Sequence, residues 1–191
     1  MLERFQPDQF TLRRKVFKLA GGTFYIFGPD EQMLFYSKQK AFKLREDIRL
    51  YSDKDKTEEL LWIQARDIVD FSAAYDVVDS TTGQKVGAFR REGWQSMMRD
   101  QWTIFDADDN PVGTVIEDSG WLAFLRRFLT SLIPQSFYVE VAGREMCAYK
   151  QHFNPFVYKL DILFPEDSNA FDKIMGLAGS VLLAAIEERQ N

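Results

Sequence analysis

Short apolar and aromatic runs alternate with turn residues along most of the chain, and this pattern predicts β-hairpins. Each unit has a strand-like run, a turn rich in Asp, Gly, Asn or Pro, and a second strand-like run. The predicted strand pairs are 24–27 with 33–36, 48–51 with 60–63, 75–78 with 85–89, 102–105 with 112–116, and 137–141 with 146–149. An open sheet of these strands would have two unpaired edges, which closure into a barrel removes. We therefore expect an antiparallel meander that closes on itself.

Residues 121–133 break the strand pattern and predict an amphipathic helix. Apolar residues recur with a period near 3.6, while Arg126 and Arg127 lie on a narrow polar face. Pro134 ends the segment. This helix could lie at a membrane interface, pack across a barrel end or form a dimer contact. The residues proposed for a membrane or partner face are Trp121, Phe124, Leu125, Arg126, Arg127 and Phe128.

The C-terminal segment 169–189 predicts a second helix that is apolar around almost its whole circumference. Such a helix must be enclosed by protein or lipid. Its uncharged stretch, 174–186, is thirteen residues long, which is short for a bilayer span. A barrel of about twelve strands is too wide for side chains alone to fill. We therefore expect this helix to occupy the barrel interior.

Composition favours one globular domain over residues 1–191. The chain is 46% hydrophobic and 28% charged, with one cysteine and one histidine. Cys147 cannot form an internal disulfide, and one Cys with one His cannot build a common zinc site. Nucleotide-binding and nucleophile-elbow motifs are absent from the sequence. We expect a non-enzymatic protein without a cofactor or a metal.

Two other candidate sites have simpler interpretations. Asp106, Asp108, Asn110 and Glu117 follow the spacing of a calcium-binding loop, but Pro111 occupies the position that needs glycine. An acidic hairpin turn is the favoured interpretation. Cys147 and His152 are five residues apart and would lie on opposite faces of a strand. We expect Cys147 to be a buried apolar residue.

The net charge of −5 is unevenly distributed. Residues 1–50 contain ten Lys or Arg against six Asp or Glu, whereas the remainder contains 14 against 23. An acidic chain is a poor partner for nucleic acid, but the basic residues near the N-terminus could bind lipid phosphate or an anionic surface. The alternative is an ordinary solvated barrel exterior. The candidate residues are Arg13, Arg14, Lys15, Lys38, Lys40, Lys43 and Arg45.

The order of these elements resembles the tubby-like superfamily, and within it the LURP-one-related proteins, which are similar to phospholipid scramblases. The resemblance rests on 10–17 (FTLRRKVF), 24–30 (FYIFGPD), 78–87 (VDSTTGQKVG) and 105–113 (FDADDNPVG). It implies a twelve-stranded barrel around a central hydrophobic helix, and membrane-linked roles. The phosphoinositide-binding residues of tubby domains do not transfer, because no motif aligns residue by residue.

The sequence thus predicts a mainly β (α+β) protein, a closed antiparallel barrel of about twelve strands around a C-terminal helix. The leading functional hypothesis is a cytoplasmic module at the inner face of the membrane that binds anionic phospholipid. A protein-interaction or scaffolding domain, or a homodimer, that never contacts lipid is the alternative. Lipid translocation is a third hypothesis, which requires the C-terminal helix to enter a bilayer.

Overall fold

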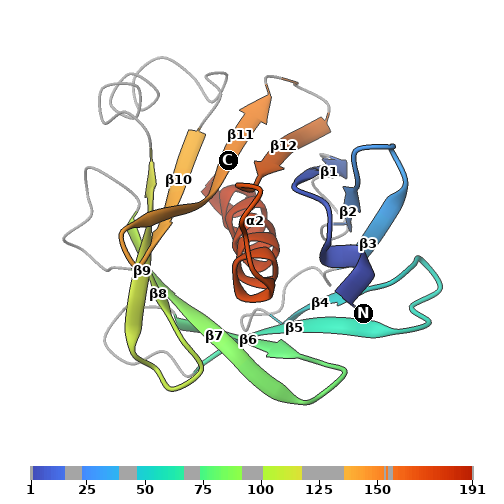
Figure 1. The fold of residues 1–191 in the computed structure, drawn as a ribbon. Coiled ribbons are helices and arrows are strands. Elements are labelled where there is room, and N and C mark those ends of the chain that lie inside the picture. The colour runs from blue at the N-terminus through green and yellow to red at the C-terminus, as the bar shows by residue number, and fades with distance from the viewer. Residues whose placement is uncertain are drawn as a thin grey trace.

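The computed structural model describes residues 2–15, 23–38, 47–66, 74–91, 101–117, 136–152, 154 and 157–190. It contains a closed twelve-stranded antiparallel barrel around one long helix (Figure 1). The strands are β1 (Gln9–Lys15), β2 (Thr23–Phe27), β3 (Met33–Lys38), β4 (Asp47–Tyr51), β5 (Glu59–Ala65), β6 (Ala74–Asp79), β7 (Gln84–Arg91), β8 (Gln101–Phe105), β9 (Pro111–Glu117), β10 (Ser136–Val141), β11 (Arg144–His152) and β12 (Val157–Leu163). A short 3-10 helix, η1 (Leu2–Phe5), precedes them, and α2 (Ala170–Gln190) follows.

The five predicted hairpins are confirmed as the strand pairs from β2/β3 to β10/β11. Each strand pairs with its sequence neighbours, so the sheet is a continuous meander. The hairpin pattern did not include β1 and β12. These two strands pair with each other from Gln9↔Leu163 to Lys15↔Val157 and close the barrel. Closure leaves no unpaired strand edge in the sheet.

Helix α2 fills the barrel, as the all-round apolar pattern predicted (Figure 1). Met175, Leu177, Ala178 and Val181 are fully buried among inward-facing strand residues. Gly176 lets the helix approach the strands closely, because a Cβ there would collide with the ring of Phe164. No helix in the described part of the chain has both the length and the hydropathy needed to cross a membrane.

Polar contacts fix the helix at its N-terminal end. Asn169 and Asp172 cap it reciprocally, each accepting a backbone N–H bond from the other. Asp172 is fully buried, and its Oδ2 also accepts a bond of 2.7 Å from Arg144 Nη2. Lys173 donates to Asp8 and to the carbonyl oxygen of Pro7. These contacts tie the helix start to β11 and to the segment before β1.

The two ends of the barrel differ in the connections they carry. One end, which we call the turn end, has the connections 28–32, 52–58, 80–83, 106–110, 142–143 and 164–169. The opposite end, which we call the rim, is where the odd-numbered strands finish and the even-numbered strands begin. Helix α2 enters at the turn end and runs toward the rim. The predicted helix 121–133 falls outside the described residues.

Candidate functional site

Acidic residues are concentrated at the turn end. The six connections there contain ten Asp or Glu residues and two lysines, a balance of −8. The acidic residues are Asp30, Glu31, Asp53, Asp55, Glu58, Asp106, Asp108, Asp109, Glu166 and Asp167. This end therefore has a strongly negative potential.

Basic residues are concentrated at the rim. The three residues of each strand nearest the rim include nine Lys or Arg and three Asp or Glu, a balance of +6. The basic residues are Arg13, Arg14, Lys15, Lys38, Arg49, Arg90, Arg91, Lys150 and Lys159. The charge asymmetry seen along the sequence thus becomes a separation of charge between the two barrel ends.

The two neighbouring arginines of β1 face opposite sides of the barrel wall. Arg13 lies outside, where its Nη2 is 2.5 Å from Glu31 Oε1 and its guanidinium covers the ring of Phe27 at 4.7 Å. Arg14 lies inside and is only 6% exposed. Its Nη1 donates a bond of 2.6 Å to the carbonyl oxygen of Ala184 in α2. Arg14 is therefore not part of an outward-facing basic surface.

The other predicted lipid-binding residues are only partly described. Lys38, the last residue of β3, is exposed, and Lys15 is the last residue of β1. The strand order brings these residues close, because β2 alone separates β1 from β3. Lys40, Lys43 and Arg45 lie outside the described residues. So do the predicted membrane or partner residues Trp121, Phe124, Leu125, Arg126, Arg127 and Phe128.

Barrel closure adds basic residues that the sequence analysis missed. Lys159 of β12 lies directly opposite Arg13, and His152 of β11 lies opposite Lys159. On the other side of Arg13, the same register continues through Tyr25, Tyr36 and Tyr51. We call this line of six residues the basic–aromatic row. Only the β1–β12 pairing joins its histidine and lysine to the arginine, so local sequence could not reveal it.

The basic–aromatic row has charged side chains in one half and aromatic side chains in the other. At its basic half, His152 Nε2 lies 2.6 Å and Lys159 Nζ 3.9 Å from opposite oxygens of Asp161. At its aromatic half, the rings of Tyr25 and Tyr36 are 5.6 Å apart. Burial raises the pKa of Tyr36, and nearby Tyr25 adds to the shift. Its hydroxyl group therefore stays protonated at neutral pH.

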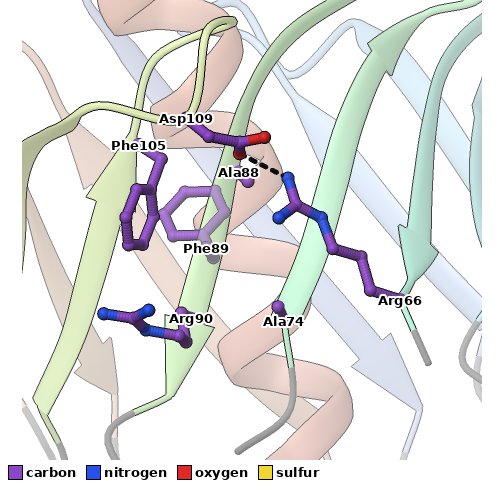
Figure 2. A pocket seen from close by; sticks show the side chains of 7 residues that line it. All are labelled: Arg66, Ala74, Ala88, Phe89, Arg90, Phe105 and Asp109. Atoms are coloured by element: carbon purple, nitrogen blue, oxygen red, sulfur yellow. Dashed lines mark hydrogen bonds and ion pairs between the residues drawn. The ribbon is translucent and has the colours of Figure 1, made fainter. Parts of the chain in front are cut away.

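A separate hollow of about 190 Å³ lies on the outer face of β5–β8. Figure 2 shows its lining: Arg66, Ala74, Ala88, Phe89, Arg90, Phe105 and Asp109. Arg66, which follows β5, donates to both oxygens of Asp76 at 2.9 Å through Nε. Its Nη2 also donates to Asp109 in the turn between β8 and β9. This ion pair holds the turn against the strands below it.

The charges around the hollow are strongly coupled. Lys85 Nζ is 2.6 Å from Asp109 and 3.5 Å from Asp76. Hydrogen bonds from Arg66 and Lys85 lower the pKa of Asp109 below its ordinary value. Hydrogen bonding to Asp76 contributes most to raising the pKa of Arg66. Asp109 and Arg66 therefore both remain ionised at neutral pH.

The remaining candidates do not form a reactive or metal-binding cluster. Asp106 Oδ1 accepts backbone bonds from Asp108 and Asn110, so this carboxylate organises its own turn. Within the described residues, no group of three or more His, Cys, Asp or Glu is placed to hold a metal ion. Cys147 is fully buried, which raises its pKa to about 12, and His152 contacts Asp161 instead. The predicted burial of Cys147 is confirmed.

The architecture defines a class of closed β-barrels whose core is supplied by a helix that follows the strands in sequence. Residues 33–168, more than half of the chain, match the LURP-one-related family. The chain therefore belongs to the LURP-one-related family, and the relation to the tubby-like superfamily is consistent with this membership. Searches of the curated proteins and of the solved structures found no significant match.

Proposed function

We propose that this barrel is a non-enzymatic module that docks on an anionic phospholipid membrane through its rim. The separation of charge between the two barrel ends carries this proposal. A membrane with negative surface potential attracts the basic rim and repels the carboxylates of the turn end. The protein would therefore approach with its rim toward the bilayer.

Exposed cations on two strands, β3 and β11, support this orientation. Lys38 and Lys150 are exposed and form no ion pair with the described residues. Basic residues near an anionic surface contribute about 1 kcal/mol each, and salt weakens this contribution. Tyr25 follows Arg13 in the basic–aromatic row, and tyrosine is enriched at membrane interfaces. The row thus combines two residue types suited to the headgroup region.

The segments outside the described residues fit the same proposal. Lys40, Lys43 and Arg45 come between β3 and β4, and 121–133 comes between β9 and β10. All four flanking strands have their connected ends at the rim. The cytoplasmic leaflet carries the anionic lipids of a cell membrane, so the proposed location is its inner face.

The test is co-sedimentation with phosphatidylserine-containing vesicles at low and high salt. We expect binding at low salt, release by 0.5 M salt, and no binding to neutral phosphatidylcholine vesicles, as is typical of screened electrostatic contacts. The double variant Lys38→Gln/Lys150→Gln should bind at least about tenfold more weakly. Its matched control, Gln32→Glu/Gln84→Glu, makes the same change in net charge at two exposed residues of the turn end and should have a much smaller effect.

Equal weakening by both double variants would show that net charge, rather than the rim, governs binding. No vesicle binding under any condition would favour the alternative, a protein-interaction or scaffolding domain without lipid contact. In that case, Phe128→Asp would test the predicted partner face. A fall in native mass by light scattering would indicate a homodimer through that face.

A further inference from the structure

The only histidine of the chain lies at the basic end of the barrel. His152 is the last residue of β11, which finishes at the rim, and its side chain is 45% exposed. Histidine is the side chain whose charge ordinarily changes between pH 5 and 8. The thiol of Cys147 has a pKa raised to about 12 and stays neutral over this range. His152 is therefore the candidate for a change in rim charge near neutral pH.

Asp161 of β12 holds the imidazole of His152 in place. Nε2 of His152 lies 2.6 Å from Oδ2 of Asp161. The other oxygen of Asp161 accepts a bond of 3.0 Å from the hydroxyl of Thr11, which lies directly opposite in β1. A carboxylate only accepts hydrogen bonds, so Nε2 carries the hydrogen in this contact and a further proton binds at Nδ1. The imidazole can therefore gain a positive charge and keep its contact with Asp161.

The other charged groups around His152 are mostly basic. Lys150 lies two residues before it on the same face of β11, and Lys159 lies opposite it in β12. Arg13 of β1 lies opposite Lys159 and is paired with Glu31. On the other side, β10 has no described charged residue level with His152, because its pairing with β11 begins opposite Lys150. With the carboxylate that His152 contacts, these described groups have a balance of +1, which protonation raises to +2.

The turn end keeps its negative charge when the pH falls. Hydrogen bonds within their own turns lower the pKa of Asp53 and of Asp106 below the ordinary value, chiefly from Thr57 and from Asn110 respectively. Both carboxylates therefore stay ionised at pH 5.5. Mild acid thus makes the rim more positive while the opposite end stays negative, so the orientation of the barrel toward an anionic surface is kept.

We propose that protonation of His152 tightens the docking of the rim on an anionic phospholipid membrane, so that binding strengthens as the pH falls from 7.5 to 5.5. This inference rests on the proposed function and adds its regulation. A positive charge gained beside anionic headgroups favours the bound state, and one such charge corresponds to about a fivefold gain in affinity.

Co-sedimentation with phosphatidylserine-containing vesicles at low salt tests the inference at pH 7.5 and 5.5. We expect the native chain to bind about fivefold more tightly at pH 5.5. His152→Gln keeps a polar side chain that cannot become charged, and it should lose this gain. His152→Lys carries the charge at both pH values, so at pH 7.5 it should bind about as tightly as the native chain does at pH 5.5.

A relocated histidine separates position from net charge. The double variant His152→Gln/Gln84→His places the imidazole on an exposed residue beside turn 80–83 of the turn end, and it should show no gain at pH 5.5. Thermal unfolding at both pH values identifies any variant that fails to fold. The imidazole NMR signals of the native chain should change between the two pH values, because they report the protonation of its single histidine directly.

The outcomes distinguish this inference from the function on which it rests. Native binding that is equal at both pH values would overturn the inference and leave the membrane proposal standing. So would a gain at pH 5.5 that folded His152→Gln or the relocated variant retains, or unchanged imidazole signals. No vesicle binding at either pH would overturn both proposals.

Discussion

Arg14 in the first strand donates a hydrogen bond of 2.6 Å to the carbonyl oxygen of Ala184 in the last helix. Its guanidinium also lies near the rings of Phe24 and Tyr158, at 5.9 and 5.3 Å from their centroids. A buried cation thus contacts both the barrel wall and the helix inside it. The contact places Arg14 in the core, although its neighbours in sequence suggest a surface role.

Arg14 and Arg13 should therefore respond differently to the same substitution. Arg14→Met removes a buried charged hydrogen bond, and we expect the free energy of unfolding to fall by about 2 kcal/mol. Arg13→Met removes an exposed ion pair with Glu31 and should cost less than about 1 kcal/mol. Urea unfolding measures both. Unchanged stability of Arg14→Met, together with weaker vesicle binding, would contradict the buried role of Arg14.

The buried carboxylate of Asp172 gives a second prediction. Arg144→Met would leave this fully buried group without its cation and should cost about 3 kcal/mol. Lys150→Met, an exposed change on the same strand, should stay within about 0.5 kcal/mol. The double variant Arg144→Met/Asp172→Asn should recover much of the loss, because it removes the unpaired charge. A double variant no more stable than the single one would argue against this account.

Substitutions at two glycines distinguish the effect of steric crowding on stability from the effect of backbone conformation. A Cβ on Gly113 of β9 would collide with the carbonyl oxygen of Glu140 in β10, so Gly113→Ala should destabilise by about 3 kcal/mol or more. Gly83 has a φ of +71°, and a Cβ added there would meet no neighbouring atom within 4 Å. Gly83→Ala should cost only about 1 kcal/mol, from the left-handed conformation. Similar chemical-denaturation midpoints for the two variants would refute the crowding argument.

Burial of Cys147 predicts slow thiol labelling in the native state. Its pKa is raised from 9.0 to about 12, chiefly by desolvation. Ellman's reagent at pH 8 should therefore react only as urea unfolds the chain. Because the native pKa is raised, stability should be full below pH 9 and fall as pH rises toward 12. Rapid labelling without urea, or stability constant over that range, would contradict this burial.

Local sequence patterns were sufficient to predict most of the fold. The five hairpins and the enclosed helix follow from turn residues, alternation and the all-round apolar face of 174–186. The two closing strands have no turn between them, since Gln9 pairs with Leu163. A hairpin pattern cannot detect such a long-range pair, although β12 alternates strictly between buried and half-buried residues.

The set of basic residues that face outward near the rim was harder to predict, because it depends on which side of a strand each residue faces. Phe10 and Leu12 are fully buried, and the two-residue period continues to Arg14. That alternation was present in the sequence and could have separated Arg14 from Arg13. The neighbours Lys159 and His152 require barrel closure. The hollow depends on a turn that is held by Arg66 and Asp109, which are 43 residues apart.

The closing strand β12 and the core helix α2 are both made after the other eleven strands. Until 157–190 has left the ribosome, β1 has no β12 to pair with, and inward-facing residues such as Phe10, Phe35 and Ile48 have no helix to cover them. The nascent chain must therefore keep a large apolar surface exposed until these two elements are made. Such a surface favours aggregation, and a premature stop codon before residue 157 would leave an open sheet with unpaired edges instead of a closed barrel.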